Sequence, residues 1–117
     1  MLEQKEITRY GLERATFLIP LRVESADRMR NIITTLIYLC RNFKTNIIVH
    51  ELDQESIFET AVVPQLEQAL LEEEMAMIYH IFEKSEDYTF HRTRLLNDMA
   101  IAANTPVVVN YDSDILL

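Results

Sequence analysis

Hydrophobic residues along the chain fall into two kinds of segment, short continuous runs and longer stretches with helical spacing. The short runs are rich in β-branched and aromatic residues, which favours strands. Because they are apolar at consecutive positions, they are typical of strands buried on both faces of a parallel sheet. Pro20 interrupts the first run and predicts a bulge or an early end there, since proline cannot donate to the ladder. The predicted strands are residues 16–23, 46–52, 77–82 and a fourth that opens at 107–109.

Between these runs, helical spacing of apolar residues predicts helices at 29–43, at 54–76, in one piece or in two around Pro64, and at 90–103. Ser25 is the expected N-cap of the first helix, because its hydroxyl can accept from a free backbone N–H. Cys40 lies on the apolar stripe of that helix, so we expect it in the core and not as a nucleophile.

The resulting order is β-α-β-α-β-α-β, which predicts a three-layer α/β/α domain with a mainly parallel four-stranded sheet. Residues 1–15 are polar and are expected to form an N-terminal arm, and residues 16–117 the domain. In such sheets, ligands bind outside the carboxyl ends of the strands. The residues that follow each predicted strand are therefore the first candidates for a site.

Composition narrows the possible ligands. The 117 residues carry a net charge of −8, which disfavours nucleic acid as a partner. A single glycine excludes the glycine-rich phosphate loops, and a single cysteine excludes an intrachain disulfide. No apolar run is long enough to span a membrane, and the charged start lacks a signal peptide, so a cytoplasmic protein is expected.

Several polar residues near the predicted strands have simple structural explanations. His50 and His91 are expected to be hydrogen-bonded caps at element ends, and His80 a histidine of the core or of a strand face. The three histidines match no metal-binding spacing. Three successive glutamates at 72–74 point in different directions on a helix and are expected on a solvated surface.

Asp112-Ser113-Asp114 is the strongest chemical signal, because it comes directly after an apolar strand. Two carboxylates in an Asp-x-Asp pattern can hold one Mg²⁺ or Mn²⁺ ion, which prefers hard oxygen ligands. Such an ion can bridge two phosphate oxygens of a nucleotide.

Read together, these segments resemble the N-terminal, nucleotide-binding half of a GT-A fold glycosyltransferase of family 2. The first strand TFLIPLRV with ESADRMRN resembles the opening of that family, and NIIVHELD lies where the family has IIVVDDGS. Residues 97–114 resemble the family's stretch that runs from an asparagine to the Asp-x-Asp pair. The resemblance covers about residues 16–117, although the glycines of those family segments are absent.

The resemblance implies roles for individual residues. Pro20 and Arg22 would lie beside the base and ribose of a nucleoside diphosphate, and Glu51 would pair with the uracil edge or ribose. Asp112 would contact ribose and, with Asp114, the metal. Arg92 or Arg94 would be the basic residue near Asn97, with Arg94 the choice for the site.

The implied activity is metal-dependent hexosyl transfer from a UDP-sugar to a glycan, as in polysaccharide biosynthesis. The chain ends three residues after Asp114, so it is expected to lack the acceptor half and the catalytic base and to be inactive alone. Its apolar end at 115–117 is compatible with a homo-oligomer. The alternatives are a non-catalytic α/β interaction module and an unrelated Mg²⁺-binding, flavodoxin-like domain.

Overall fold

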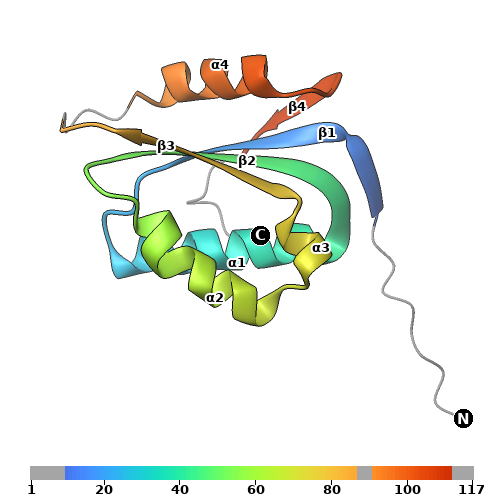
Figure 1. Ribbon diagram of the computed structural model, residues 1–117. Coiled ribbons are helices and arrows are strands. Elements are labelled where there is room, and N and C mark those ends of the chain that lie inside the picture. The colour runs from blue at the N-terminus through green and yellow to red at the C-terminus, as the bar shows by residue number, and fades with distance from the viewer. Residues whose placement is uncertain (1–9, 87–90, 112–117) are drawn as a thin grey trace, which may run out of the picture.

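A four-stranded, all-parallel sheet with the strand order β3-β2-β1-β4 forms the centre of the computed structural model, which describes residues 10–86 and 91–111 (Figure 1). The three-layer α/β fold predicted from the sequence is confirmed. The elements in chain order are β1 (Tyr10–Leu21), α1 (Ala26–Asn42), β2 (Phe43–Asp53), the π-helical segment η1 (Phe58–Val62), α2 (Val63–Ala69), α3 (Glu72–Met75), β3 (Ile78–Lys84), α4 (Arg92–Ala102) and β4 (Val107–Asn110).

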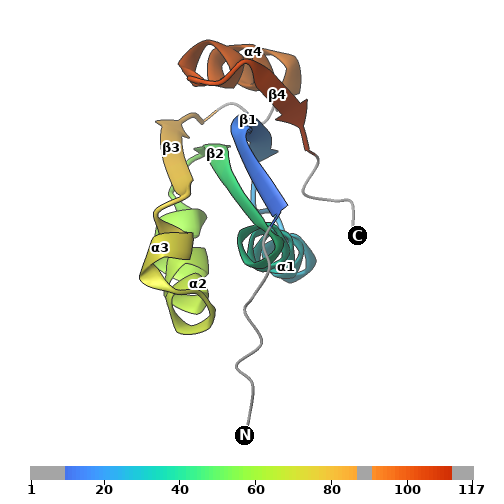
Figure 2. The same cartoon turned by 90° about the vertical axis from the view of Figure 1, so that its right-hand side faces the viewer.

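Helices cover the sheet unequally. Helices α1, α2 and α3 lie against one face, whereas α4 lies alone across the other (Figures 1 and 2). Side chains alternate between the faces along each strand. Thus Ile47 and Val49 pack toward α1 and α2, while Ile48 and Leu52 pack with Leu95 of α4. Each face of the sheet therefore has its own hydrophobic core.

Helix α1 forms where its periodicity predicts. The Ser25 side chain accepts a hydrogen bond from the backbone N–H of Arg28 at 3.1 Å, which confirms it as the N-cap. Cys40 is fully buried in the core between α1 and the sheet, as predicted.

The first strand is longer than predicted, because residues 10–15, assigned to the N-terminal arm, belong to β1. The register of β1 against β2 shifts between Gly11 and Thr16, and the Thr45 hydroxyl donates to the carbonyls of Leu12 and Ala15 across this irregularity. Pro20 causes no bulge, because it pairs in register with His50, but β1 ends one residue later at Leu21, short of the predicted end at Val23. Within the described residues β4 pairs with β1 only as far as Leu18, so Pro20 has a neighbouring strand on one side only.

The helix predicted at 54–76 is divided into η1, α2 and α3. Pro64 lies in the first turn of α2, a position that tolerates proline, and the chain turns again at Leu70. Glu72 and Glu73 are exposed as expected, but Glu74 is buried. Its Oε1 accepts from the backbone N–H of Leu71 at 2.7 Å, so Glu74 caps α3 and is not a surface residue.

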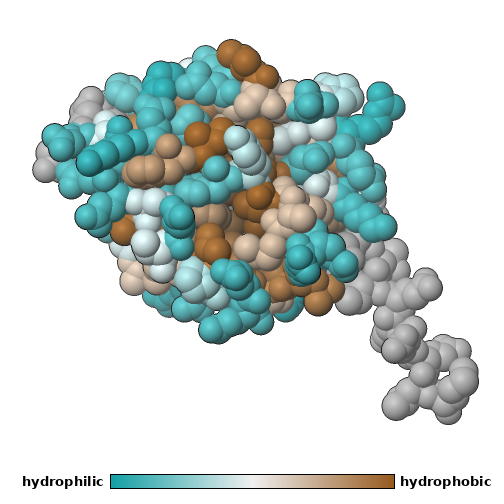
Figure 3. Space-filling model, viewed as in Figure 1, coloured by the Kyte–Doolittle hydropathy of each residue, from teal (hydrophilic) through white to brown (hydrophobic). Residues whose placement is uncertain are grey.

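The edge strand β3 is only partly covered. Tyr79 and Phe82 on this strand are 62% and 38% exposed. Hydrophobic residues show in the middle of this face of the molecule, between polar residues of the helices above and below (Figure 3). In the described part of the chain, no helix is long and apolar enough to cross a membrane.

Candidate functional site

The strand order identifies one place on the sheet where ligands are expected. From β1 the chain passes through α1 to β2, and through the helices on that same face to β3. It then crosses the other face through α4 and enters β4 on the far side of β1. The topological switch point therefore lies between β1 and β4. In open α/β sheets, ligands bind at the carboxyl ends of the strands that flank such a point.

Several predicted site residues lie at or beside this switch point. Pro20 is buried near the end of β1, and Arg22 follows the strand with only 7% of its surface exposed. The Nε of Arg22 lies 3.9 Å from Oε1 of Glu24. Directly after the neighbouring strand β4, the backbone N–H of Tyr111 donates to the carbonyl of Leu18 at 2.9 Å. Asp112 and Asp114 come next in the sequence and lie outside the described residues.

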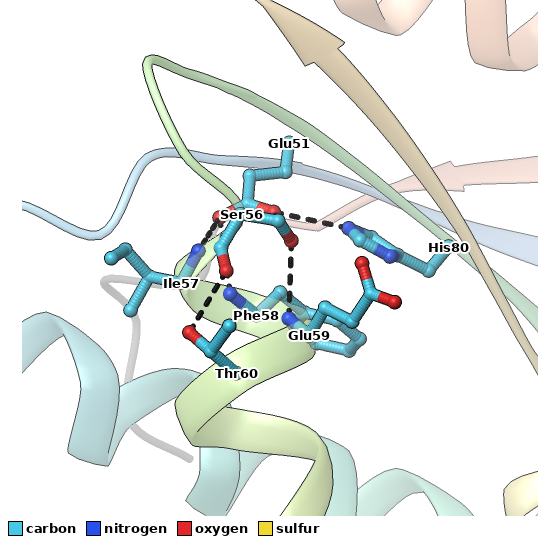
Figure 4. A network of polar contacts seen from close by, with 7 residues as sticks. All are labelled: Glu51, Ser56, Ile57, Phe58, Glu59, Thr60 and His80. Atoms are coloured by element: carbon cyan, nitrogen blue, oxygen red, sulfur yellow. Dashed lines mark hydrogen bonds and ion pairs between the residues drawn. The ribbon is translucent and has the colours of Figure 1, made fainter.

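Glu51 lies at the carboxyl end of β2, but on the face covered by α1 and α2, where it is fully buried. Its Oε1 accepts from the Ser56 hydroxyl at 2.7 Å and contacts Nε2 of His80 at 3.1 Å. Its Oε2 accepts from the backbone N–H groups of Ile57 and Phe58, at 2.9 and 3.1 Å (Figure 4). Both oxygens of Glu51 are therefore occupied within the fold, and the carboxylate caps the start of η1.

This network is a cap and not a nucleophilic triad. In a triad the histidine lies between the hydroxyl and the carboxylate. Here Ser56 and His80 both bind the carboxylate of Glu51. The ring of His80 also packs on Phe58, with centroids 4.5 Å apart, so His80 belongs to a strand face as predicted.

The hydrogen bonds around Glu51 lower its pKa and so favour the ionised carboxylate. Burial opposes ionisation and would raise the pKa of Glu51. Hydrogen bonds from His80, Ser56 and the backbone of Phe58 outweigh burial and hold the pKa of Glu51 below its ordinary value of 4.5. Glu51 is therefore ionised at neutral pH, and its charge is spread over four donors.

A second polar group lies on the opposite face, beneath α4. Arg94 makes two hydrogen bonds to Glu83, at 2.7 and 3.1 Å, and one to Asp98 at 3.1 Å. The Arg94 guanidinium, helped by His50, lowers the pKa of Glu83. Arg94 thus connects the first turn of α4 to the end of β3.

His50 lies inside this second group and is not the end cap that the sequence suggested, because β2 continues past it to Asp53. Its side chain is only 4% exposed. Its Nε2 lies 3.3 Å from Oε1 of Glu83, but the alignment falls short of a hydrogen bond. Within the described residues, Nδ1 of His50 has no hydrogen-bond partner, and Nε2 has only this poorly aligned contact with Glu83.

The first turn of α4 contains two arginines, of which Arg94 is engaged in ion pairs and Arg92 is exposed to solvent. Arg94 is held by Glu83 and Asp98, whereas Arg92 is exposed at the first position of the helix. His91 is the N-cap residue, but its side chain makes no capping bond to the helix. Arg92 therefore faces solvent at the carboxyl edge more freely than Arg94 does.

Two further observations bear on the identity of the site. Among residues 10–86 and 91–111, no three His, Cys, Asp or Glu side chains gather where they could hold a metal ion. Compared with protein-family models, curated proteins and solved structures, the chain matches none.

Proposed function

We propose that this chain is the nucleotide-sugar-binding half of a glycosyltransferase similar to family 2, which transfers a hexose from a UDP-sugar to a glycan. One observation carries the proposal. The switch point of the sheet lies between β1 and β4, which are the two strands that lead into Arg22 and into the Asp-x-Asp segment. Topology and sequence pattern therefore point independently to the same edge of the sheet.

In this proposal the base and ribose lie over the end of β1, beside Pro20 and Arg22. Arg92 is the better candidate for the basic residue near Asn97, because Arg94 is engaged by Glu83 and Asp98. Glu51 is an unsuitable partner for the base, since its two oxygens already accept four hydrogen bonds on the other face.

The metal of the proposal depends on Asp112 and Asp114, because the described residues gather no metal-binding group of their own. Carboxylate oxygens are the ligands that Mg²⁺ and Mn²⁺ prefer. A cation held there would neutralise the departing diphosphate. The role of the fold in this proposal is to hold the nucleoside and to set its distance from that pair.

Calorimetric titration of the chain with UDP, in the presence and absence of Mn²⁺, tests the proposal. We expect metal-dependent binding that is lost in Asp112→Ala and in Asp114→Ala. Glu55→Ala is the matched control, because Glu55 is an exposed acidic residue after β2 that the site does not use. The proposal fails if UDP does not bind, or if both aspartate variants bind UDP and Mn²⁺ as the native chain does.

A further inference from the structure

The outer edge of β3 is a regular strand edge that no strand covers in the described part of the chain. β3 lies at one end of the strand order, and its pairing with β2 runs without a shift to Lys84. Edge strands in proteins are usually short, bulged or interrupted by proline, because their open backbone groups pair readily with another strand. β3 has seven residues and carries neither a bulge nor a proline. The edge is therefore open to a further strand.

Two backbone hydrogen bonds identify the residues of β3 that face this edge. The N–H of Ile47 donates to the carbonyl of Met77, and the N–H of Ser85 donates to the carbonyl of Asp53, both at 2.9 Å. Alternate residues of a strand direct their backbone groups to opposite neighbours. The odd-numbered residues from 77 to 85 therefore bond to β2. The even-numbered residues direct their N–H and C=O groups outward, and these are Ile78, His80, Phe82 and Lys84.

Apolar side chains lie on both sides of this edge. Tyr79 pairs in register with Ile48 and is exposed on the face of α4, whereas Phe82 is exposed on the opposite face. A cavity of about 220 Å³ opens between Tyr79 and the end of α4, where Ala102 and Ala103 line it. An added strand would direct every second side chain toward α4 and this cavity. Apolar residues are therefore favoured at those positions.

The helices on the opposite face make the other side of the edge acidic. The segment 54–77, which forms η1, α2 and α3, contains six glutamates and no lysine, arginine or histidine. Five of these glutamates are exposed, and the carboxylate of Glu59 points toward β3 (Figure 4). Lys84 at the end of β3, and Lys44, which lines a cavity with Glu73, offset part of this charge. Basic residues are therefore favoured on this side of an added strand.

We propose that the outer edge of β3 binds an extended segment of a partner protein in which apolar and basic residues alternate. The segment adds a fifth strand through the outward N–H and C=O groups of β3. Its apolar side chains pack toward α4, and its basic side chains face the glutamates of η1, α2 and α3. A second copy of the chain fits less well, because antiparallel pairing of two β3 strands brings their acidic helices together. Nucleotide binding at the ends of β1 and β4 neither requires nor excludes this contact.

Calorimetry with a capped peptide of about nine residues, in which valine and lysine alternate, tests the charge and the pattern. At low ionic strength we expect it to bind at least about tenfold more tightly than a valine–glutamate peptide, or than a peptide with the same residues in two blocks. Glu59→Lys combined with Glu72→Lys should weaken binding by about tenfold or more. Glu24→Lys, which changes an exposed glutamate after β1, is the matched control and should change binding by less than about threefold.

Amide hydrogen exchange, followed by nitrogen-15 NMR, tests the geometry in the native chain. The valine–lysine peptide should slow exchange at His80 and Phe82, whose N–H groups face outward. Exchange at Tyr79 and Ile81 should not change, because their N–H groups bond to β2. Phe82→Pro should abolish binding, since it removes an outward N–H that β2 does not use. Phe82→Val keeps this N–H and should still bind the peptide.

The assignment is overturned if the valine–lysine and valine–glutamate peptides bind alike, or if protection does not alternate along β3. It is also overturned if Phe82→Pro binds the peptide as Phe82→Val does. If the chain alone forms dimers that Phe82→Pro abolishes, a second copy and not a partner segment occupies the edge. Should Phe82→Pro fail to fold, the exchange pattern of the native chain still decides between these results.

Discussion

Each face of the sheet carries one histidine–glutamate pair that joins β2 to β3, yet the two pairs are built differently. On the face of α2, Glu51 of β2 binds His80 of β3 and three further donors. On the face of α4, His50 of β2 approaches Glu83 of β3 without a well-aligned hydrogen bond. In the first pair the glutamate is fully buried, and in the second the buried member is the histidine.

The difference separates a residue on which the fold depends, Glu51, from one that contributes little to its stability, His50. The buried carboxylate of Glu51 accepts four hydrogen bonds that hold the loop and the start of η1. These bonds contribute to the stability of the fold. The buried imidazole of His50 makes one poorly aligned contact, with Glu83, and therefore adds little to the stability of the fold. Adjacent residues on one strand can thus contribute very differently to stability.

Glu51→Ala should have the largest effect on stability. The substitution leaves the buried backbone N–H of Phe58, the partly buried N–H of Ile57 and the Ser56 hydroxyl without their acceptor. We expect the free energy of unfolding to fall by about 3–5 kcal/mol, as for other broken buried charge networks. Urea denaturation measures the loss. Glu55→Ala, an exposed glutamate in the same loop, should change stability by less than about 0.5 kcal/mol. Equal effects of the two variants would refute the capping role.

Acid should weaken the same network. The folded-state pKa of Glu51 lies below its ordinary value of 4.5, so its contribution is complete above pH 4.5. The contribution is lost as the pH falls through the lower, folded-state pKa. Urea unfolding at several pH values should therefore show the native chain and Glu51→Gln converging in stability below pH 4.5. The other carboxylates titrate in both proteins and cancel in the difference. A difference that stays constant down to low pH would contradict the lowered pKa.

The fold was largely predictable from sequence because periodicity reports burial directly. The continuous apolar runs marked all four strands, and Ser25 marked the start of α1. The irregular elements were not predictable in this way. The charged residues Glu13 and Arg14 concealed the first half of β1, because their side chains are exposed on a strand whose backbone pairs irregularly.

The site was less accessible to sequence reasoning, because spacing does not reveal which face a residue occupies at the end of a strand. Glu51 looked like a ligand-binding carboxylate, but its partners at Ser56 and His80 come from other elements. One usable signal was present. The adjacent polar residues His50 and Glu51 lie inside an apolar strand, and strand alternation requires them to face opposite sides.

Arg94→Ala should have a smaller effect that depends on salt. Arg94, Glu83 and Asp98 form a partly exposed ion-pair group, which solvent and counter-ions screen. We expect a modest loss of thermal stability at low ionic strength and almost none in 1 M salt, where the screening length is about 3 Å. Arg92→Ala is the control from the same turn, since Arg92 makes no ion pair within the described residues. A loss that is independent of salt would show that Arg94 acts through packing.

His50→Leu should have the smallest effect on stability and gives the sharpest contrast with Glu51→Ala. Leucine replaces an imidazole that makes one poorly aligned polar contact, with Glu83, among the described residues, and it lies between Ile48 and Leu52 of the α4-side core. Replacing an uncompensated buried polar group by an apolar group of similar size is nearly neutral or stabilising, so we expect a change within about 1 kcal/mol. His80→Leu, measured beside it by urea denaturation, should cost more, because it removes a donor from the buried Glu51 carboxylate. If His50→Leu is the more damaging of the two, then His50 is a structural residue and the two faces of the sheet do not differ as described.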